Sequence, residues 1–401
     1  MFPWLLAGAL LSYAVLPHCA ASLGERAFPE LSSSALADLA NLREPSRNLD
    51  SSDPYSHLHK ILIPRPADTE NHTLVRNYLV STLRKLNWHI EEDSFVDMTP
   101  YGPKNFTNVI ATKDPDAPRR VVLSAHFDSK FFPSYPENQF VGATDSAASC
   151  AMMLDIAETL DPLLDARARR VEQAELGLGD DDDIDEYTAE TTLQLIFFDG
   201  EEAFIDWTAT DSIYGARHLA ETWASTYLPP HPKRRLISAA SPSTPLSTIE
   251  HLILLDLIGA PHPRVRSYFP DTAWLFDTLV SAETRLRAAG ILDADALGRS
   301  FFYSRSAGDV SLSYMGDDHL PFLHRGVSVL HVITEPFPHV WHTLGDDATA
   351  LDLPTLSAWN VILRVFFAEY LGLRPEPSSK RGEPSSPTHN PAQVRKSDNE
   401  L

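Results

Sequence analysis

The sequence predicts an α/β fold in which one central, mixed and mostly parallel sheet is covered by helices on both faces. Short segments rich in apolar and β-branched residues, without polar alternation, are typical of strands buried on both sides; they are residues 108–112, 120–126, 191–198, 251–258 and 327–333. Helical periodicity marks residues 74–86, 146–160, 212–223, 272–289 and 353–370. Strands that alternate with helices in this way indicate a single covered sheet.

The 401-residue chain is expected to form one catalytic domain over residues 22–373, because no internal repeat and no second apolar core is evident. Residues 161–190 are strongly charged and residues 228–247 are rich in proline and serine, so both are expected to be surface insertions. Residues 374–401 are rich in Pro, Ser, Lys and Glu, which predicts a disordered tail.

The first residues have the composition of a secretory signal. An apolar stretch from Phe2 to Leu16 is followed by small residues, which predicts a signal peptide over residues 1–21. An uncleaved anchor in the secretory pathway is the alternative, but the run is short for a membrane span, and no other segment could cross a membrane. Glycosylation sequons at Asn71 and Asn105 agree with a secreted glycoprotein or a protein of the secretory lumen.

Charge and cysteine content narrow the possible partners. The net charge of −22 excludes nucleic acid as an expected partner, because an acidic surface repels phosphate. One of the two cysteines, Cys19, lies in the predicted signal, so the mature chain keeps only Cys150, which we expect to be a free, buried thiol. A metal in this protein cannot therefore be held by a cluster of thiolates.

Histidine and carboxylate side chains follow the predicted strands at the points where the strands end. The group consists of His126, Asp128, Asp145, Glu201, Glu202, Asp256, His339 and His342. Taken singly, Asp145 could cap a helix, His126 could be a core histidine and His342 could lie on the surface. Together they indicate a ligand site, because α/β sheets bind ligands beyond the carboxyl ends of their strands.

The side chains in this group favour a catalytic zinc. Asp256 lies in an apolar run, where a carboxylate must be paired, protonated or bound to a metal. The adjacent Glu201 and Glu202 need a cation or a shared proton, because like charges repel. Imidazole and carboxylate ligands without thiolate suit a zinc that keeps one open position. One glutamate could then hold the cation while the other moves a proton.

Longer strings make the chain recognisable. Between Phe140 and Asp347 it contains "FVGATDSA", "CAMMLDIAETL", "LIFFDGEEAF", "DSIYGARHLA", "LLDLIGAP", "DDHLPFLHRGV" and "FPHVWHTLGDD". These strings resemble the glutaminyl-peptide cyclotransferase branch of the zinc aminopeptidase superfamily. The resemblance implies a zinc-dependent aminoacyltransferase that converts the N-terminal glutamine of peptides or proteins to pyroglutamate and releases ammonia, with glutamate as a slow substrate. One zinc per chain and a monomer are expected.

The resemblance also implies a role for individual residues. The zinc ligands would be Asp145, Glu202 and His342. Glu201 would be the general acid/base, with Asp256 and Asp317 as a hydrogen-bonded acidic pair beside it. The substrate pocket would be lined by Trp207, Phe337 and Trp341 and supported by His331. The substrate's own α-amine is the nucleophile, so one carboxylate can take its proton and pass a proton to the departing ammonia.

The sequence departs from this family pattern at two positions. Ala125 stands where members often carry the disulfide partner of Cys150, and Gly316 stands where a glutamine is common. The main rival interpretation is a secreted two-zinc aminopeptidase, for which all five ligand types are present: His126, Asp145, Glu202, Asp256 and His342. Asp145 is followed by Ser-Ala rather than by an Asn-Gly type of continuation, which favours the cyclotransferase. A non-enzymatic binding module would lack one of the chemical residues, and none is missing.

Overall fold

The computed structural model describes residues 27–178, 186–229, 243–305 and 315–375. Its strands form a single six-stranded sheet in the order β1-β2-β4-β3-β5-β6. The strands are β1 (His89–Thr99), β2 (Gly102–Thr112), β3 (Arg119–His126), β4 (Thr191–Phe198), β5 (Ile249–Asp256) and β6 (Val329–Ile333). Strands β4, β3, β5 and β6 run parallel to one another. Strand β2 pairs in antiparallel fashion with both β1 and β4. The predicted mixed, mostly parallel sheet is confirmed.

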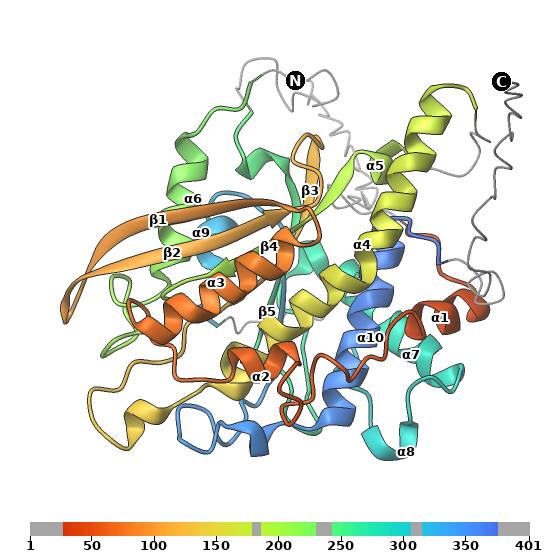
Figure 1. The fold of residues 1–401 in the computed structure, drawn as a ribbon. Coiled ribbons are helices and arrows are strands. Elements are labelled where there is room, and N and C mark those ends of the chain that lie inside the picture. The colour runs from red at the N-terminus through yellow and green to blue at the C-terminus, as the bar shows by residue number, and fades with distance from the viewer. Residues whose placement is uncertain (1–26, 179–185, 230–242, 306–314, 376–401) are drawn as a thin grey trace, which may run out of the picture.

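Helices cover both faces of this sheet (Figure 1). They are α1 (Ser33–Ala40), α2 (His57–Ile61), α3 (Glu70–Arg84), α4 (Ala148–Glu175), α5 (Glu186–Ala189), α6 (Tyr214–Ser225), α7 (Ala273–Ala288), α8 (Ala294–Leu297), α9 (Leu320–Leu323) and α10 (Leu353–Tyr370). Val121 and Leu123 of β3 belong to a core cluster with α3, α4, α7 and α10, whereas Val122 belongs to a second cluster with α6 and α9. Because successive strand residues point to opposite faces, burial on both sides removes polar alternation.

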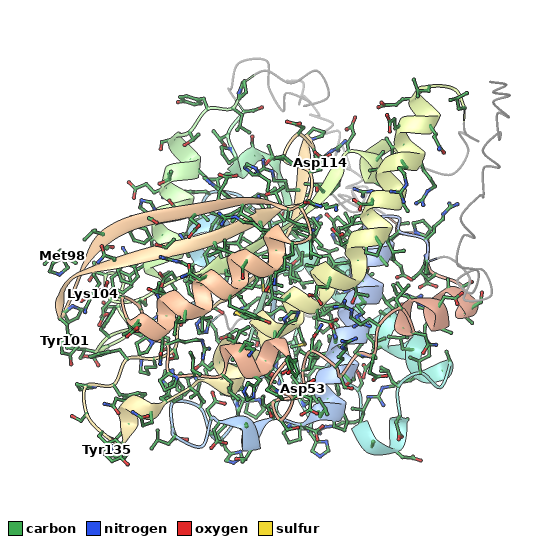
Figure 2. All side chains as sticks on the ribbon, in the orientation of Figure 1. Asp53, Met98, Tyr101, Lys104, Asp114 and Tyr135 are labelled. Atoms are coloured by element: carbon green, nitrogen blue, oxygen red, sulfur yellow. The ribbon has the colours of Figure 1, made fainter. Side chains whose placement is uncertain are left out.

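Two elements differ from the sequence prediction. Strand β1 was not predicted, because most of its side chains are exposed or half-buried and it contains Glu91, Glu92 and Asp93. With β2 it forms a long hairpin that projects from the body of the protein, with Met98, Tyr101 and Lys104 at its tip (Figure 2). The predicted insertion over residues 161–190 is only partly an insertion, since α4 continues through it as far as Glu175.

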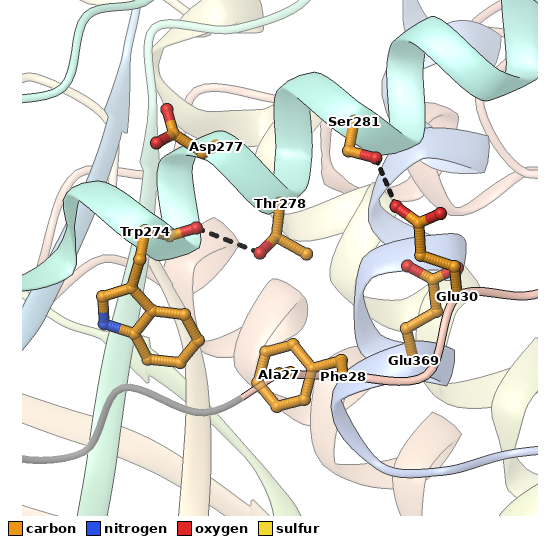
Figure 3. Close-up of a pocket in the computed structure, with 8 residues that line it drawn as sticks. All are labelled: Ala27, Phe28, Glu30, Trp274, Asp277, Thr278, Ser281 and Glu369. Atoms are coloured by element: carbon orange, nitrogen blue, oxygen red, sulfur yellow. Dashed lines mark hydrogen bonds between the residues drawn. The ribbon is translucent and has the colours of Figure 1, made fainter. Parts of the chain in front are cut away.

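The segment that follows the predicted signal packs on the rest of the domain. Phe28 contacts the rings of Trp274 and Tyr370, with ring centroids 5.5 and 4.7 Å apart. Ser281 of α7 donates a hydrogen bond of 2.8 Å to Glu30 (Figure 3). These contacts surround a cavity of about 380 Å³ that shares no lining residue with the candidate active site described below.

Several of the other sequence predictions concern residues that lie wholly or partly outside the described ranges. The predicted signal (1–21) lies outside the described residues, as do most of the tail (374–401) and part of the insertion at 228–247. None of the helices within the described ranges is long and apolar enough to span a membrane. Cys150 is a buried free thiol, as predicted, and its Sγ donates to the backbone oxygen of His126 at 3.1 Å. The sequon residues Asn71 and Asn105 lie on α3 and β2.

Candidate metal centre and active site

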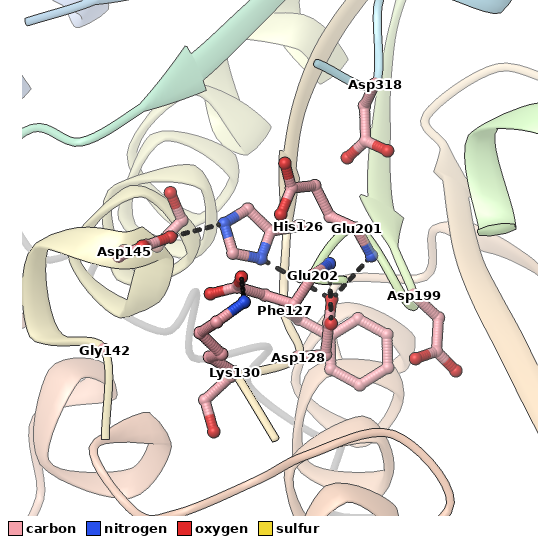
Figure 4. Close-up of polar contacts among 12 residues, drawn as sticks. His126, Phe127, Asp128, Lys130, Gly142, Asp145, Asp199, Glu201, Glu202 and Asp318 are labelled. Carbon is pink, nitrogen blue, oxygen red and sulfur yellow. Dashed lines mark hydrogen bonds and ion pairs between the residues drawn. The ribbon is translucent and has the colours of Figure 1, made fainter. Parts of the chain in front are cut away.

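Buried polar side chains meet at the carboxyl ends of the three central parallel strands. His126 is the last residue of β3 and Asp256 the last of β5, while Glu201 and Glu202 follow β4 after a turn at Gly200. The register pairs His126 with Phe198, so β3 and β4 end side by side. Figure 4 shows the result: side chains from separate parts of the sequence point into one region. The predicted gathering of residues at the strand ends is confirmed.

Asp145, Glu202 and His342 form one compact group. His342 Nε2 lies 3.5 Å from Asp145 Oδ2 and 3.3 Å from Glu202 Oε2, and the ligand atoms of the three residues lie within 4.8 Å of one another. Glu202 Oε1 is buried and has no hydrogen-bond partner among the described residues. Two buried carboxylates beside an imidazole, with one oxygen unpaired, are the donor set of a zinc site. The residues present therefore fit the metal.

The two carboxylates of this group shift the pKa of His342. Burial alone would lower the pKa of His342, but hydrogen bonds to Asp145 and Glu202, and the negative charges of both, raise it to about 9. Burial alone would raise the pKa of Asp145, but hydrogen bonds to His126 and His342, and the charges of both, hold it well below its usual value.

Local backbone geometry explains how Asp145 reaches the group. Residues Ala143–Ala147 form an irregular helical turn that leads into α4, and Asp145 has non-helical φ and ψ of −120° and 80°. Gly142, which precedes this turn, has φ of +54°, and a Cβ at this position would lie 2.1 Å from the backbone oxygen of Asp145. Only glycine fits there. The ring of His342 stacks on Trp341, with ring centroids 3.9 Å apart.

Asp128 fixes the pair of glutamates. Its carboxylate accepts hydrogen bonds from the backbone N–H groups of Glu201 and Glu202, at 3.2 and 3.3 Å, and lies 3.5 Å from Nδ1 of His126 (Figure 4). From the sequence, Asp128 was predicted to lie at a strand end, but no role was predicted for it. Asp199, the third carboxylate of the β4 turn, lies outside the site, where it contacts His72 Nε2 at 2.8 Å. His339 is exposed and also lies outside it.

Glu201 is placed to hold a proton. It is buried, and this burial together with the charges of Glu202, Asp317 and Asp318 raises its pKa well above the usual value, while His126 opposes the shift. Asp318 is also fully buried, and neither of its carboxyl oxygens has a hydrogen-bond partner among the described residues. Burial and the charge of Asp317 raise its pKa as well. The carboxyl groups of Glu201 and Asp318 can thus both be neutral.

Asp256 and Asp317 each have a hydrogen-bond partner other than the expected one. Ser146 Oγ donates to Asp256 Oδ1 at 2.6 Å, while Asp317 Oδ2 lies 2.7 Å from His331 Nε2. The two carboxyl groups interact through their charges: burial and then the charge of Asp317 raise the pKa of Asp256 to about 6. The hydrogen-bonded pair therefore stays a prediction, and the sequence did not reveal the partners Ser146 and His331.

A second group of potential ligands adjoins the first and shares Asp145 with it. His126 Nε2 lies 3.0 Å from Asp145 Oδ1 and 3.5 Å from Asp256 Oδ1, and all three side chains are buried. A third group, Asp317, His319 and His331, lies deeper in the domain. The arrangement around Asp145 is one in which a single aspartate could bridge two cations.

A cavity of about 410 Å³ opens onto these residues. Its lining includes the predicted Trp207, Phe337 and Trp341, together with Glu201, Glu202, Asp145, Asp256, His342, Lys130, Ile205, Asp206 and Gly316. Trp207 and Trp341 are 47% and 40% exposed, so they stand at the mouth. Neither His331 nor its partner Asp317 lines the cavity. A Cβ on Gly316 would lie 3.2 Å from the indole nitrogen of Trp207.

Comparison with known proteins agrees with this architecture. The pattern of peptidase family M28 matches residues 108–367. A glutaminyl-peptide cyclotransferase from Bos taurus is 41% identical over 84% of this chain and 88% of its own length. One from Drosophila melanogaster is 38% identical over 91% of this chain and 90% of its own. The crystal structure of Macrostomum lignano glutaminyl cyclase, 38% identical, superimposes with a TM-score of 0.70 and covers 88% of this chain and 97% of that one.

The matched region contains all strands except β1 and the first part of β2, and all the candidate site residues. The relatives are aligned over most of their own length as well as most of this chain. The chain therefore belongs to peptidase family M28, in its glutaminyl-peptide cyclotransferase branch.

Proposed function

We propose that this protein is a glutaminyl-peptide cyclotransferase, which converts an N-terminal glutamine to pyroglutamate. The substrate's α-amine nitrogen attacks the side-chain amide carbon, a ring C–N bond forms, and the amide nitrogen departs as ammonia. With N-terminal glutamate, water departs instead, more slowly. One observation carries the proposal: the buried carboxyl group of Glu201 lines a small aromatic pocket beside a zinc-type ligand set.

Asp145, Glu202 and His342 would hold one zinc ion per chain. When bound, the metal supplies Lewis-acid polarisation of the substrate's amide carbonyl. Glu202 serves as a ligand and its neighbour Glu201 stays free, because the Asp128 carboxylate fixes both backbone N–H groups. This division of labour gives the adjacent glutamates separate tasks.

Glu201 acts as general base and then as general acid. It takes a proton from the attacking α-amine and delivers one to the departing nitrogen, so its protonation state is the same before and after the cycle. Asp256, with its pKa raised to about 6, and the ionised Asp317 control the charge around Glu201 while this proton moves. No nucleophile from the protein is needed, because the attacking amine belongs to the substrate.

The aromatic residues orient the substrate. Trp207, Phe337 and Trp341 line the cavity, and the rings of Phe337 and Trp341 meet edge to face with centroids 5.1 Å apart. Such walls suit a short neutral side chain, and they hold the amine and amide in a reactive pose. His331 supports the pocket indirectly, through Asp317.

We further propose a monomeric enzyme that is secreted or retained in the secretory lumen after removal of residues 1–21. The apolar N-terminal stretch and the sequons at Asn71 and Asn105 support this location. The mature protein would be a glycoprotein that acts on peptides or proteins with an N-terminal glutamine.

An ammonia-release assay tests the proposal. Purified protein is incubated with glutaminyl-alanine amide, and ammonia and the cyclic product are measured with and without a zinc chelator. Release that depends on zinc and is restored by adding it supports the function. Intact substrate after prolonged incubation with zinc-loaded protein would contradict it.

One observation favours a second candidate, a two-zinc aminopeptidase. His126 and Asp256 lie on the far side of Asp145 from His342, at distances that a second cation could bridge. The hydrogen bond from Ser146 already engages Asp256 Oδ1, and His126 carries a raised pKa because four surrounding carboxylates outweigh its burial. The hydrogen bond from Ser146 would compete with a second metal for Asp256 Oδ1. Two bound zinc ions together with release of free amino acids would support the aminopeptidase.

A further inference from the structure

Three consecutive residues present side chains to solvent at the mouth of the active-site cavity. Ile205 is 56% and Trp207 47% exposed, and Asp206 between them is also exposed. All three line the same cavity as Glu201 and Glu202. The mouth therefore offers apolar surface on both sides of one carboxylate.

The backbone beneath these side chains is firmly held. The N–H groups of Phe204, Ile205 and Asp206 donate to the carboxylate of Asp211 at 2.9, 2.9 and 3.2 Å, and Tyr214 donates to the same carboxylate at 2.7 Å. Asp211 is buried. The loop thus fixes where the three outward side chains begin, so a ligand meets a prepared surface.

Within the described ranges no residue neutralises the charge of Asp206. Its carboxylate receives no hydrogen bond and no ion pair from any residue in the described ranges. Lys130, which lines the same cavity, is only 15% exposed and turns inward, where its Nζ donates to Ala203 O at 3.0 Å and lies 3.4 Å from Glu202 Oε2. The other acidic groups of the cavity are buried. Asp206 is therefore the acid that an incoming peptide meets first.

We propose that Ile205, Asp206 and Trp207 form a subsite for a lysine or arginine side chain at one of the two positions that follow the N-terminal glutamine. This inference rests on the proposed function and specifies its substrates. The methylene stem of such a residue packs on Ile205, while its cation meets the carboxylate of Asp206 and the face of Trp207. An acidic residue at these positions is repelled, all the more because the whole protein carries a net charge of −22.

The expected preference is moderate, because the subsite is open to water. An exposed ion pair with a cation–π contribution changes affinity by about two- to ten-fold. It should appear in KM rather than in kcat, because the subsite lies outside the reacting atoms. It should also weaken as salt is raised, because exposed charges are screened.

The test compares amidated peptides Gln-X-Ala and Gln-Ala-X in which X is lysine, norleucine or glutamate. Norleucine matches the stem of lysine without its charge. The expected order of kcat/KM is lysine, norleucine, glutamate in at least one series, with the lysine advantage reduced at high salt. Asp206→Asn should remove the difference between lysine and norleucine, and Asp206→Lys should place glutamate first.

Asp116→Asn is the matched control. It removes the same charge from an exposed position in the loop before β3, at the opposite end of that strand from His126, and should keep the lysine preference. Thermal unfolding midpoints verify that each variant is folded. Ammonia release with no preference among the three peptides, or a lysine preference that survives Asp206→Asn, overturns the inference alone. No release from any peptide contradicts the proposed function itself, and the inference with it.

Discussion

His331 and Asp317 lie in direct contact: Nε2 of the histidine is 2.7 Å from Oδ2 of the aspartate, and both side chains are buried. Burial alone would raise the pKa of Asp317, but this hydrogen bond and the charge of His331 hold it below its usual value. Asp317 therefore keeps a negative charge next to the active site. That charge helps to raise the pKa of Asp256 to about 6, although burial is the larger cause.

Asp256 and Asp317 should consequently behave as one unit in catalysis. Asp256→Asn should keep part of the activity, since the amide oxygen still accepts the hydrogen bond from Ser146, whereas Asp256→Ala should lose most of it. A double-mutant cycle on kcat/KM should give a coupling term of about 0.5–3 kcal/mol, as expected for interacting neighbours. Strictly additive losses for the two alanine variants would show that the residues act independently.

Glu201→Gln should separate chemistry from metal binding. The amide keeps the shape of the side chain but cannot shuttle a proton, so kcat should fall by roughly 10²–10⁴-fold or more while zinc is retained. Glu202→Gln should instead weaken zinc affinity, because Glu202 belongs to the ligand group. Zinc content and kcat are measured on both variants. Full activity of zinc-loaded Glu201→Gln would refute the assigned role.

Removal of zinc should abolish turnover but leave the protein folded. A metal held by the candidate ligands would supply activation of the substrate carbonyl, whereas the stability of the fold comes from the large apolar cores on both faces of the sheet. Elemental analysis, circular dichroism and ammonia release are followed during chelation and zinc replacement, with one zinc per chain expected at full activity. Undiminished turnover by protein shown to be free of metal would count against the mechanism.

His57 should make the protein less stable in mild acid. Burial, the largest cause, lowers its pKa to about 4 in the folded state, against about 6.5 when unfolded. Between these values the unfolded chain binds the extra proton, so stability is lost as pH falls from about 6.5 to about 4. At about 1.36 kcal/mol per pKa unit the loss amounts to roughly 3 kcal/mol.

His57→Gln should remove this part of the pH dependence. In chemical unfolding experiments from pH 7 to pH 4, the free energy of unfolding should fall less for the variant than for the wild type. His59→Gln, at an exposed position of the same helix, is the control and should follow the wild-type curve. Parallel curves for wild type and His57→Gln would contradict the shifted pKa.

The elements with strong local signals were predictable from the sequence. Helix α10 was predicted with its observed bounds because Asp352 caps it, accepting from the N–H of Thr355, and proline occupies its first turn. The buried strands were found from their apolar runs. Strand β1 was missed because it lacks a buried face over most of its length, and the end of α4 was missed because its last turns are highly charged.

The site was predictable in composition but not in its contacts. Strand ends brought His126, Glu201 and Asp256 together because parallel strands finish at the same edge of the sheet. The partners chosen by each carboxyl group depend on side-chain directions that the sequence does not encode locally. Thus Asp256 accepts a hydrogen bond from Ser146, while Asp317 is hydrogen-bonded to His331, which lies on the neighbouring strand β6.

Helix α4 leads from the candidate active site to a distant part of the surface where a label or a solid support could be attached. Its 28 residues rise about 1.5 Å each, so its axis measures about 42 Å from Ala148, near the candidate metal ligand Asp145, to Glu175. Leu176 and Leu178 beyond it are largely exposed. A fluorophore or a linker to a sensor chip placed there would leave the pocket free for substrates, so the enzyme could be immobilised in one orientation and used repeatedly as a reagent.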